Sequence, residues 1–199
     1  YVMSMATLTV TGNSVFGLST SSSSSLTLTT GSIAISGSAT MYSSSSGNII
    51  INCTGNFSST STGGAALISV PVVLPTVAPQ AYAFAFQNSS TASRTYNLNL
   101  GGNFSVTGTG LFGGGSSSAS SAANINFTGG AASVTYTAAP SVMSVTNNNK
   151  KNNFVVASGK TLTLNNSIIP ASSSSSNSWT FTVNTGAVLD FGTHSIGDP

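Results

Sequence analysis

The sequence predicts an all-β chain folded as a right-handed parallel β-solenoid, or β-helix, with Ser-rich loops inserted between its coils. Three observations support this prediction: an internal repeat, a recurring strand motif and a composition with almost no charge. Of the 199 residues, 3% are charged and 39% are hydrophobic, whereas about 25% are charged in an ordinary globular domain. Because apolar residues alternate with polar ones in short runs, we expect strands with one buried and one solvated face.

The internal repeat is clearest near the C-terminus, where residues 154–164 match residues 181–191. Six pairs share their character at one constant spacing: Phe154/Phe181, Val156/Val183, Gly159/Gly186, Leu162/Leu189, Leu164/Phe191 and Ile169/Ile196. A unit of roughly 20 to 30 residues cannot bury its own apolar face and must stack on its neighbours. We therefore expect residues 1–199 to form a single solenoid segment. Because the chain starts without Met and stops directly after a repeat, we expect it to be a piece of a longer protein.

A second motif, apolar-x-apolar-x-Gly, recurs through the first two-thirds of the chain. Five aligned copies begin at Leu8, Ile33, Ile51, Leu98 and Ile125. Alternation places one side of a short strand inward, and glycine gives the backbone the freedom for a tight corner. In this alignment the first residue of each motif points inward, as do Leu162 and Leu189 of the C-terminal repeat.

Polar tracts and one proline-rich stretch interrupt these motifs. Four serine tracts are predicted to be loops that project from the coils: residues 21–25, 43–46, 116–118 and 172–176. Residues 66–92 are predicted to leave the stack, since three prolines cannot continue a central β-ladder. Within them we expect an extended excursion over residues 70–80 and a strand at Tyr82–Phe86 that returns to the stack. No helix is expected, because no helical apolar period stands out.

The residues that could perform catalysis are nearly absent. There is no Glu, and the only carboxylates are Asp190 and Asp198. General acid–base and glycosidase mechanisms need a pair of placed carboxylates, but Asp190 is expected to face outward on a strand and Asp198 to lie in a terminal turn. His194, the only histidine, aligns with Ser167 and is interpreted as a solvated turn residue. We therefore expect no enzyme, and no catalytic, cofactor-binding or metal-binding residue is predicted.

The single cysteine and the few charges exclude further classes of function. Cys53 aligns with Val10 and Leu100, which predicts a buried thiol that acts as a small hydrophobe. The net charge is +2, and the only basic pair, Lys150–Lys151, is interpreted as part of a solvated loop. This charge is too small for a nucleic-acid footprint. Since the sequence has no apolar run long enough to span a bilayer, no membrane insertion is expected.

Two other surface features leave alternatives open. Thr-x-Thr pairs recur at Thr7/Thr9, Thr27/Thr29, Thr135/Thr137, Thr161/Thr163 and Thr180/Thr182. On one flat face they would form a hydroxyl grid, as in ice-binding solenoids, although Thr also suits any exposed strand position. The aromatic residues that could stack on sugars are Tyr42, Tyr82, Tyr96, Tyr136 and Trp179, but strand positions suit core packing equally well.

Three phrases of the sequence resemble a known family of repeats. They are Leu-Asn-Leu-Gly-Gly-Asn-Phe at 98–104, Val-Ala-Ser-Gly-Lys-Thr-Leu-Thr-Leu at 156–164 and Val-Asn-Thr-Gly-Ala-Val-Leu-Asp-Phe-Gly at 183–192. These phrases resemble the β-strand repeats of very large secreted surface adhesins of the Bacteroidetes type, which are similar to filamentous-haemagglutinin and autotransporter β-helices. The resemblance implies export by the type 9 secretion system, an extracellular or cell-surface location, and a role in adhesion or gliding.

The expected function is therefore that of a structural or adhesive segment of an extracellular filament, without cofactors. The expected partners are further repeats of the same parent chain, or another protein, abutting both ends; secretion or attachment machinery and glycans are further candidates. A polysaccharide-binding or polysaccharide-degrading β-helix is the main alternative, and an ice-binding solenoid is a second one. A degrading enzyme would need a carboxylate or Arg/Lys cluster that the sequence lacks.

Overall fold

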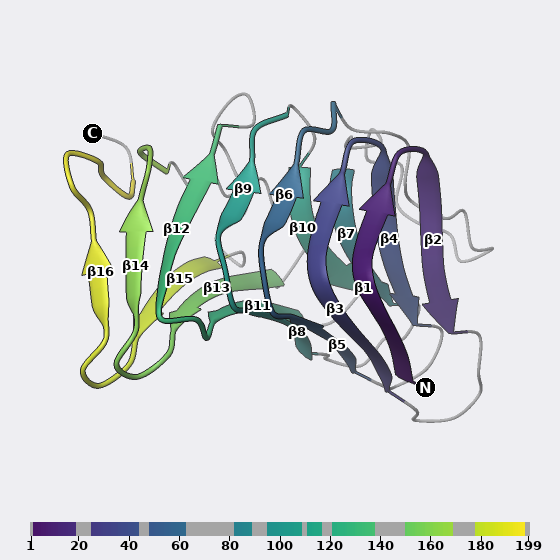
Figure 1. Ribbon diagram of the computed structural model, residues 1–199, viewed down its shortest axis with the longest axis horizontal. Helices are drawn as coiled ribbons and strands as arrows, with labels where there is room; N and C mark the ends of the chain where they lie inside the picture. Colours follow the sequence, from purple (N-terminus) through teal and green to yellow (C-terminus); the bar gives the residue numbers. More distant parts are fainter. Residues whose placement is uncertain are drawn as a thin grey trace.

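The chain coils into a parallel β-solenoid, which confirms the predicted fold class (Figure 1). The structure is a computed structural model that describes residues 2–18, 25–43, 48–62, 82–88, 95–108, 111–116, 121–137, 150–168 and 178–197. Among these residues there are 16 strands and no helix. The strands form a 12-stranded and a 4-stranded sheet, in which neighbouring strands pair in parallel.

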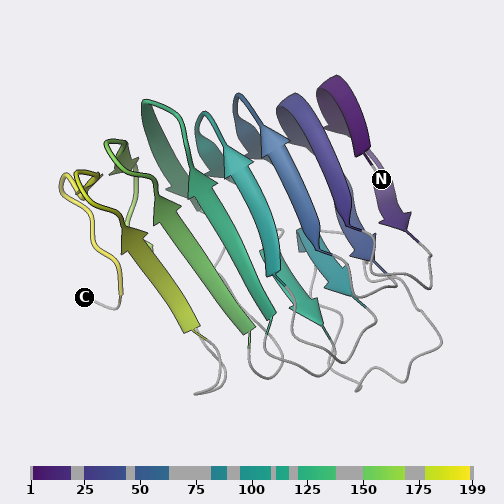
Figure 2. The same ribbon diagram turned by 90° about the horizontal axis from the view of Figure 1, so that it is seen from below.

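Three faces make up each complete coil. The first face contains the N-terminal parts of β1 (Val2–Val10) and β3 (Leu26–Ile35), followed by β5 (Ile49–Cys53), β8 (Thr95–Leu100), β11 (Ser121–Phe127), β13 (Lys150–Val156) and β15 (Ser178–Val183). The second face contains the C-terminal parts of β1 and β3, followed by β6 (Phe57–Ser59), β9 (Phe104–Val106), β12 (Ala131–Tyr136), β14 (Thr161–Leu164) and β16 (Val188–Asp190). The third face contains β2 (Asn13–Leu18), β4 (Ser38–Ser43), β7 (Tyr82–Asn88) and β10 (Leu111–Ser116). Figure 2 shows the strands of the first face side by side.

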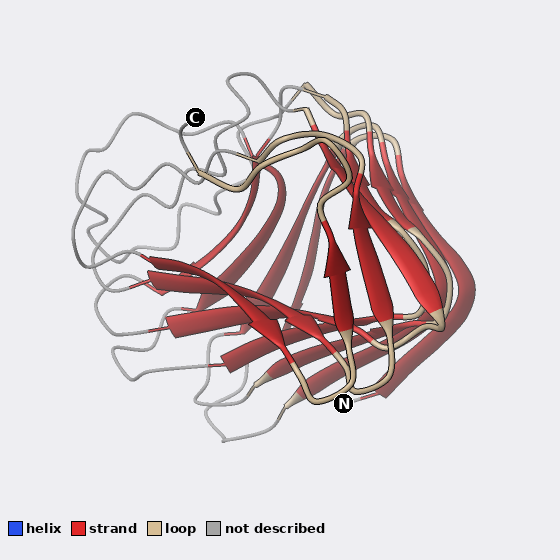
Figure 3. Cartoon of the chain, turned by 90° about the vertical axis from the view of Figure 1, so that its left-hand side faces the viewer, coloured by secondary structure: helices blue, strands red, loops and turns tan. Residues whose placement is uncertain are grey.

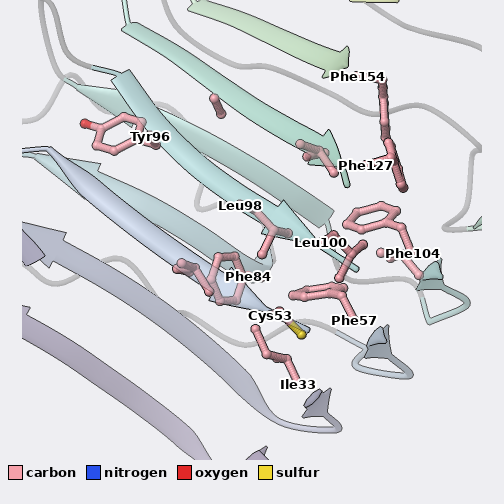
Figure 4. Close-up of a cluster of buried hydrophobic side chains, with 14 of the residues drawn as sticks. Ile33, Cys53, Phe57, Phe84, Tyr96, Leu98, Leu100, Phe104, Phe127 and Phe154 are labelled. Atoms are coloured by element: carbon pink, nitrogen blue, oxygen red, sulfur yellow. The ribbon is translucent and has the colours of Figure 1, made fainter. Parts of the chain in front are cut away.

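The core is built from columns of inward side chains that repeat at the same place on successive coils. The central column of the first face is fully buried in the middle of the stack and consists of Leu28, Ile51, Leu98, Ile125 and Phe154. Aromatic rings stack in the same way: the centroids of Phe57 and Phe104 are 5.1 Å apart (Figure 4). Those of Phe154 and Phe181 are 4.9 Å apart. Near-parallel ring pairs add about 0.5–1.5 kcal/mol beyond the buried area.

Most residues predicted to point inward are buried, namely Leu8, Ile33, Ile51, Leu98, Ile125 and Leu162. Leu189 is only half-buried, although it packs against the core. It lies on β16, which is the last strand of the second face, and no described strand covers it on the far side.

The predicted alignment of the five glycine motifs is wrong in part. Cys53 is the Cα partner of Thr30 and Leu100 on the first face. Val10 and Ile35, which the alignment places beside Cys53, instead pair with each other on the second face. The first two motifs thus lead into the third face, whereas the last three lead from the first face into the second. The motif cannot distinguish these corners, because each corner needs the same strand and turn.

Successive coils differ in length. The inward column that contains Cys53 consists of Met5, Thr30, Cys53, Leu100, Phe127, Val156 and Val183. Hydrogen bonds join successive coils along the first face and its corner. From the N-terminal to the C-terminal end, the bonded residues are 25, 23, 47, 27, 29 and again 27 positions apart in the sequence. The constant spacing of the C-terminal repeat is therefore one of several step lengths. At the end of the chain, Ile196 bridges Ile168 rather than the predicted Ile169.

The predicted strand at Tyr82–Phe86 is present as β7, which pairs with β4 and β10. Residues 66–81 and 89–92 of the predicted excursion lie outside the described residues, as do most residues of the serine tracts. Lys150–Lys151 is not a loop: it opens β13, where its two residues pair with Ser121 and Ala122. Its strand position reflects the parallel partner β11, which the local sequence does not reveal.

The coil widens from the N-terminal to the C-terminal end. Between equivalent inward positions on the first and second faces, Met5 and Leu8 are three positions apart and Cys53 and Phe57 are four apart. Further along the stack, Phe127 and Val134 are seven apart. Figure 3 views the stack from its C-terminal side.

The corner between the first and second faces changes with this widening. β3 passes through it without interruption, whereas the corner between β13 and β14 takes the four residues 157–160 and that between β15 and β16 the four residues 184–187. Gly159 and Gly186 adopt positive φ values of 70° and 73° in these wider corners.

Glycines line the narrower form of this corner because successive coils approach closely there. A Cβ atom on Gly31 would lie 2.5 Å from the carbonyl oxygen of Ala6, and one on Gly55 would lie 2.5 Å from that of Gly31. A Cβ atom on Gly129 would collide with the carbonyl oxygen of Gly101. Glycine is therefore required at these positions for the coils to stack at the strand spacing of about 4.8 Å.

Candidate functional site

The most regular polar feature is a pair of asparagine columns on the outer side of the first face, called here the asparagine ladders. In the first ladder, the amide nitrogen of Asn99 donates to the side-chain oxygen of Asn52 over 2.8 Å. Asn126 donates to Asn99 in the same way, also over 2.8 Å. The side chains are half-buried, because neighbouring amides of successive coils cover one another.

The second ladder runs beside the first and is one coil longer. Asn124 donates to Asn97 over 3.0 Å, and Asn153 donates to Asn124 over 2.7 Å. The hydroxyl of Thr180 donates to the side-chain oxygen of Asn153 and ends the column. The two ladders are two residues apart along each strand, which corresponds to about 6.7 Å, and their rungs are about 4.8 Å apart.

Each amide in the ladders retains unused hydrogen-bonding capacity. An asparagine amide has two N–H donors and an oxygen with two lone pairs, and a ladder bond uses one donor or one lone pair. Asn99 and Asn124, in the middle of their ladders, use one of each. The remaining donors and acceptors form a regular neutral array on a sheet whose geometry is fixed by backbone pairing.

Other asparagines complete the coil-to-coil hydrogen bonding where backbone pairing is interrupted. The side-chain oxygen of Asn56 accepts from the backbone N–H of Asn103, and that of Asn103 accepts from the N–H of Ser133, both over 2.9 Å. Asn166 accepts from the N–H of Tyr136 over 2.8 Å. These amides replace missing backbone partners, so their role is structural.

The second face presents mainly small side chains. Its outer column consists of Thr9, Ala34, Ser58, Ser105 and Thr135. Thr7/Thr9 lie on this face, whereas Thr27/Thr29 lie on the first face beside Ile50 and Asn52. None of the described Thr-x-Thr pairs stacks directly on another one, so they do not form a continuous grid.

The titratable groups are dispersed. Asp190 is exposed at its predicted outward position, and its carboxylate accepts from the N–H of Gly192 over 2.9 Å. His194 is half-buried in a turn, where its backbone N–H donates to the carbonyl oxygen of Phe191 over 2.8 Å. Asp198 and Arg94 lie outside the described residues. No group of three His, Cys, Asp or Glu side chains suited to a metal occurs in the described ranges.

Cys53 is buried with 2% of its surface exposed, as predicted. Burial raises the pKa of its thiol, and backbone hydrogen bonding from Gly55 opposes part of that shift. A raised pKa keeps the sulfur protonated near neutral pH, which is the opposite of what a nucleophilic cysteine needs.

The aromatic residues considered as sugar-stacking platforms divide into two groups. Tyr96 and Tyr136 are fully buried and belong to the core (Figure 4 shows Tyr96). The side chains of Tyr42, Tyr82 and Trp179 lie outside the described part of the chain. A flat stacking surface is therefore not formed by the two tyrosines whose environment is known.

The asparagine ladders were not predicted as a site. The signal was present in the sequence, because Asn97/Asn124 and Asn99/Asn126 recur at the spacing of the C-terminal repeat, but without the register these pairs only interrupt the expected threonine grid. Comparison with known proteins found no matching family model, no matching curated protein and no matching solved structure. Among the described residues, there is no helix with the length and apolar character needed to cross a membrane.

Proposed function

We propose that this chain is a non-enzymatic structural and adhesive segment of a secreted, cell-surface solenoid, and that the first face is its adhesive surface. The observation that supports this proposal best is the pair of asparagine ladders, whose central amides use only half of their hydrogen-bonding capacity. The ladders form a rigid, neutral and repeated array, which suits many weak contacts with a repeated ligand.

The energetics favour a long, repetitive ligand over a small one. A single neutral hydrogen bond contributes only about 0.5–1.5 kcal/mol net, so affinity has to come from several rungs engaged together. A rigid sheet lowers the ordering cost of such binding because the donors are already in place. A neutral polysaccharide, whose hydroxyl groups both donate and accept, is the ligand class that this array fits.

The location and export route rest on the resemblance of the repeats to secreted surface adhesins. Under this proposal the type 9 secretion system exports the parent protein, and the coils act as a spacer that holds the adhesive face away from the cell. The near-absence of charge fits contacts that do not depend on ionic strength.

Sedimentation of the purified chain with insoluble cellulose, chitin or starch tests this proposal. We expect retention on at least one polymer, with equal retention at about 0.05 and 0.5 M salt. Replacing the central rungs, Asn99→Thr with Asn124→Thr, should weaken retention by about tenfold, the equivalent of one or two hydrogen bonds. The matched control, Ser58→Ala with Ser105→Ala on the second face, should bind like the unmodified chain.

Two results would contradict the proposal: retention that falls steeply with salt, or equal loss in the ladder and control variants. Release of soluble sugar during the incubation would instead identify a degrading enzyme. Thermal hysteresis in the same preparation would indicate ice binding, which is a separate alternative.

A further inference from the structure

The asparagine ladders are longer along the stack than along any one strand. β8 and β11 each present two amides on their outer side, two residues apart. Along the stack, the amides continue over the four successive strands β5, β8, β11 and β13 (Figure 2). Their spacing is about 4.8 Å in that direction and about 6.7 Å along a strand. A long ligand therefore meets more amides, at closer intervals, if it lies across the strands.

Aliphatic side chains occupy two opposite corners of this array. Ile50 takes the β5 position in the column of the second ladder, and Val155 takes the β13 position in the column of the first. Both side chains are half-buried on the outer side of the face, and neither can form a hydrogen bond. The other two corners carry Asn52 and Asn153. The amides therefore form a strip that crosses the first face obliquely from β5 to β13.

A threonine follows the strip at each end. Thr29 is the Cα partner of Asn52, and Thr180 is the Cα partner of Asn153. The hydroxyl of Thr180 donates to the side-chain oxygen of Asn153. A hydroxyl has one donor where an amide has two, so the full set of donors and acceptors ends with the four strands of the strip.

We propose that the ligand of this strip is an extended, unbranched neutral polysaccharide of the cellulose or chitin type, which lies across the strands with about one sugar ring for each coil. The inference rests on the proposed function and adds to it the shape and direction of the bound chain. A straight chain of pyranose rings carries polar groups along its edges at an interval close to the strand spacing, so successive rings meet successive rungs. A helically coiled chain such as starch cannot follow a straight array in this way.

Displacement by soluble oligosaccharides of increasing length tests this inference. The protein is first retained on insoluble cellulose or chitin, and cello- or chito-oligosaccharides then compete for it. We expect the concentration for half displacement to fall with each added sugar up to about four sugars and then to level off, because the amides cover four strands. Retention on starch should be at least about tenfold weaker than on the straight polymers.

Matched Thr→Asn variants test the direction of the bound chain. Thr29→Asn and Thr180→Asn each add an amide in line with a ladder, at opposite ends of the strip. Thr95→Asn adds one beside the strip, at an exposed position two residues before Asn97 on β8. We expect each in-line variant to move the plateau to oligosaccharides about one sugar longer and to bind these about three- to tenfold more tightly. Thr95→Asn should change neither value. Thermal unfolding confirms that each variant is folded, and either in-line variant alone suffices for the comparison.

Three results would overturn the inference: half displacement that does not depend on length beyond the disaccharide, equal retention on starch, or a gain for Thr95→Asn equal to that of the in-line variants. In each of these cases the protein is still retained on a polysaccharide, so the proposed adhesive function stands. Absence of retention on every polymer would overturn both.

Discussion

The side-chain amide of Asn99 donates to the side-chain oxygen of Asn52 over 2.8 Å, although 47 residues separate the two. The contact exists because β5 and β8 are adjacent in register, with Asn52 and Asn99 as Cα partners. The chain therefore leaves the first face after β5 and returns to it at β8. The polar column continues from one of these strands to the other.

Removing a central rung should cost more stability than removing a terminal one. Asn99→Ala deletes two ladder bonds and Asn52→Ala deletes one. At about 0.5–1.5 kcal/mol per bond, the expected losses are about 1–3 and about 0.5–1.5 kcal/mol. Urea unfolding monitored by circular dichroism measures both values. Equal losses would show that the ladder bonds do not contribute individually.

Two adjacent glycines should differ in how much stability the same substitution costs. A Cβ atom at Gly129 collides with the backbone of Gly101, whereas one at Gly130 meets no atom within 4 Å. Gly129→Ala should therefore destabilise the chain by about 1–3 kcal/mol through overpacking, and Gly130→Ala should change it by no more than about 0.5 kcal/mol. Thermal unfolding of the two variants is the measurement. Similar Tm values would mean that the corner relaxes to admit a methyl group.

The ring stack should be most sensitive in its interior. Phe154 is fully buried between Phe127 and Phe181, so Phe154→Ala should cost about 3–5 kcal/mol. Phe181 lies at the open end and is only half-buried, so Phe181→Ala should cost clearly less. Comparing urea midpoints of the two variants gives the ranking, and a larger loss at Phe181 would contradict the open-end geometry.

Burial of Cys53 predicts both slow labelling and a pH dependence of stability. The folded state raises the pKa of the thiol, so the native protein should react with a thiol reagent at least about a hundredfold more slowly than the unfolded chain. Because the folded pKa is above the unfolded one, stability is fully retained below the unfolded pKa. It declines as the pH rises from there towards the folded pKa.

The variant Cys53→Ala provides the control for that pH dependence. It should lose less stability than the unmodified chain over the same alkaline range, because it has no thiol to ionise. Rapid stoichiometric labelling of the native protein, or identical pH profiles for the two chains, would contradict the buried position of the sulfur.

The fold class was predictable because period-two alternation and glycine corners are local properties of the sequence. Ile51, Leu98 and Ile125 point inward as their neighbours in the sequence imply. Assigning each glycine motif to a corner was not possible, since Val10 and Cys53 have the same local pattern on different faces. That assignment depends on how many residues each coil uses, which is a long-range property.

The candidate site escaped prediction for the same reason. An asparagine on an exposed strand position is unremarkable until the register places another one directly above it. Lys150–Lys151 illustrates the converse case, because only the pairing with β11 identifies these residues as part of a strand.

The long step from β5 to β8, which separates Asn52 from Asn99 by 47 residues, has a practical consequence for protein engineering. The strands on either side keep their pairing although the connection from β6 to β7 takes residues 60–81, whereas that from β9 to β10 takes only residues 107–110. The scaffold therefore already accommodates a long connection between β6 and β7. An epitope, enzyme or reporter whose ends lie close together can be inserted there, so that the rigid stack becomes a display platform for cargo of the experimenter's choice.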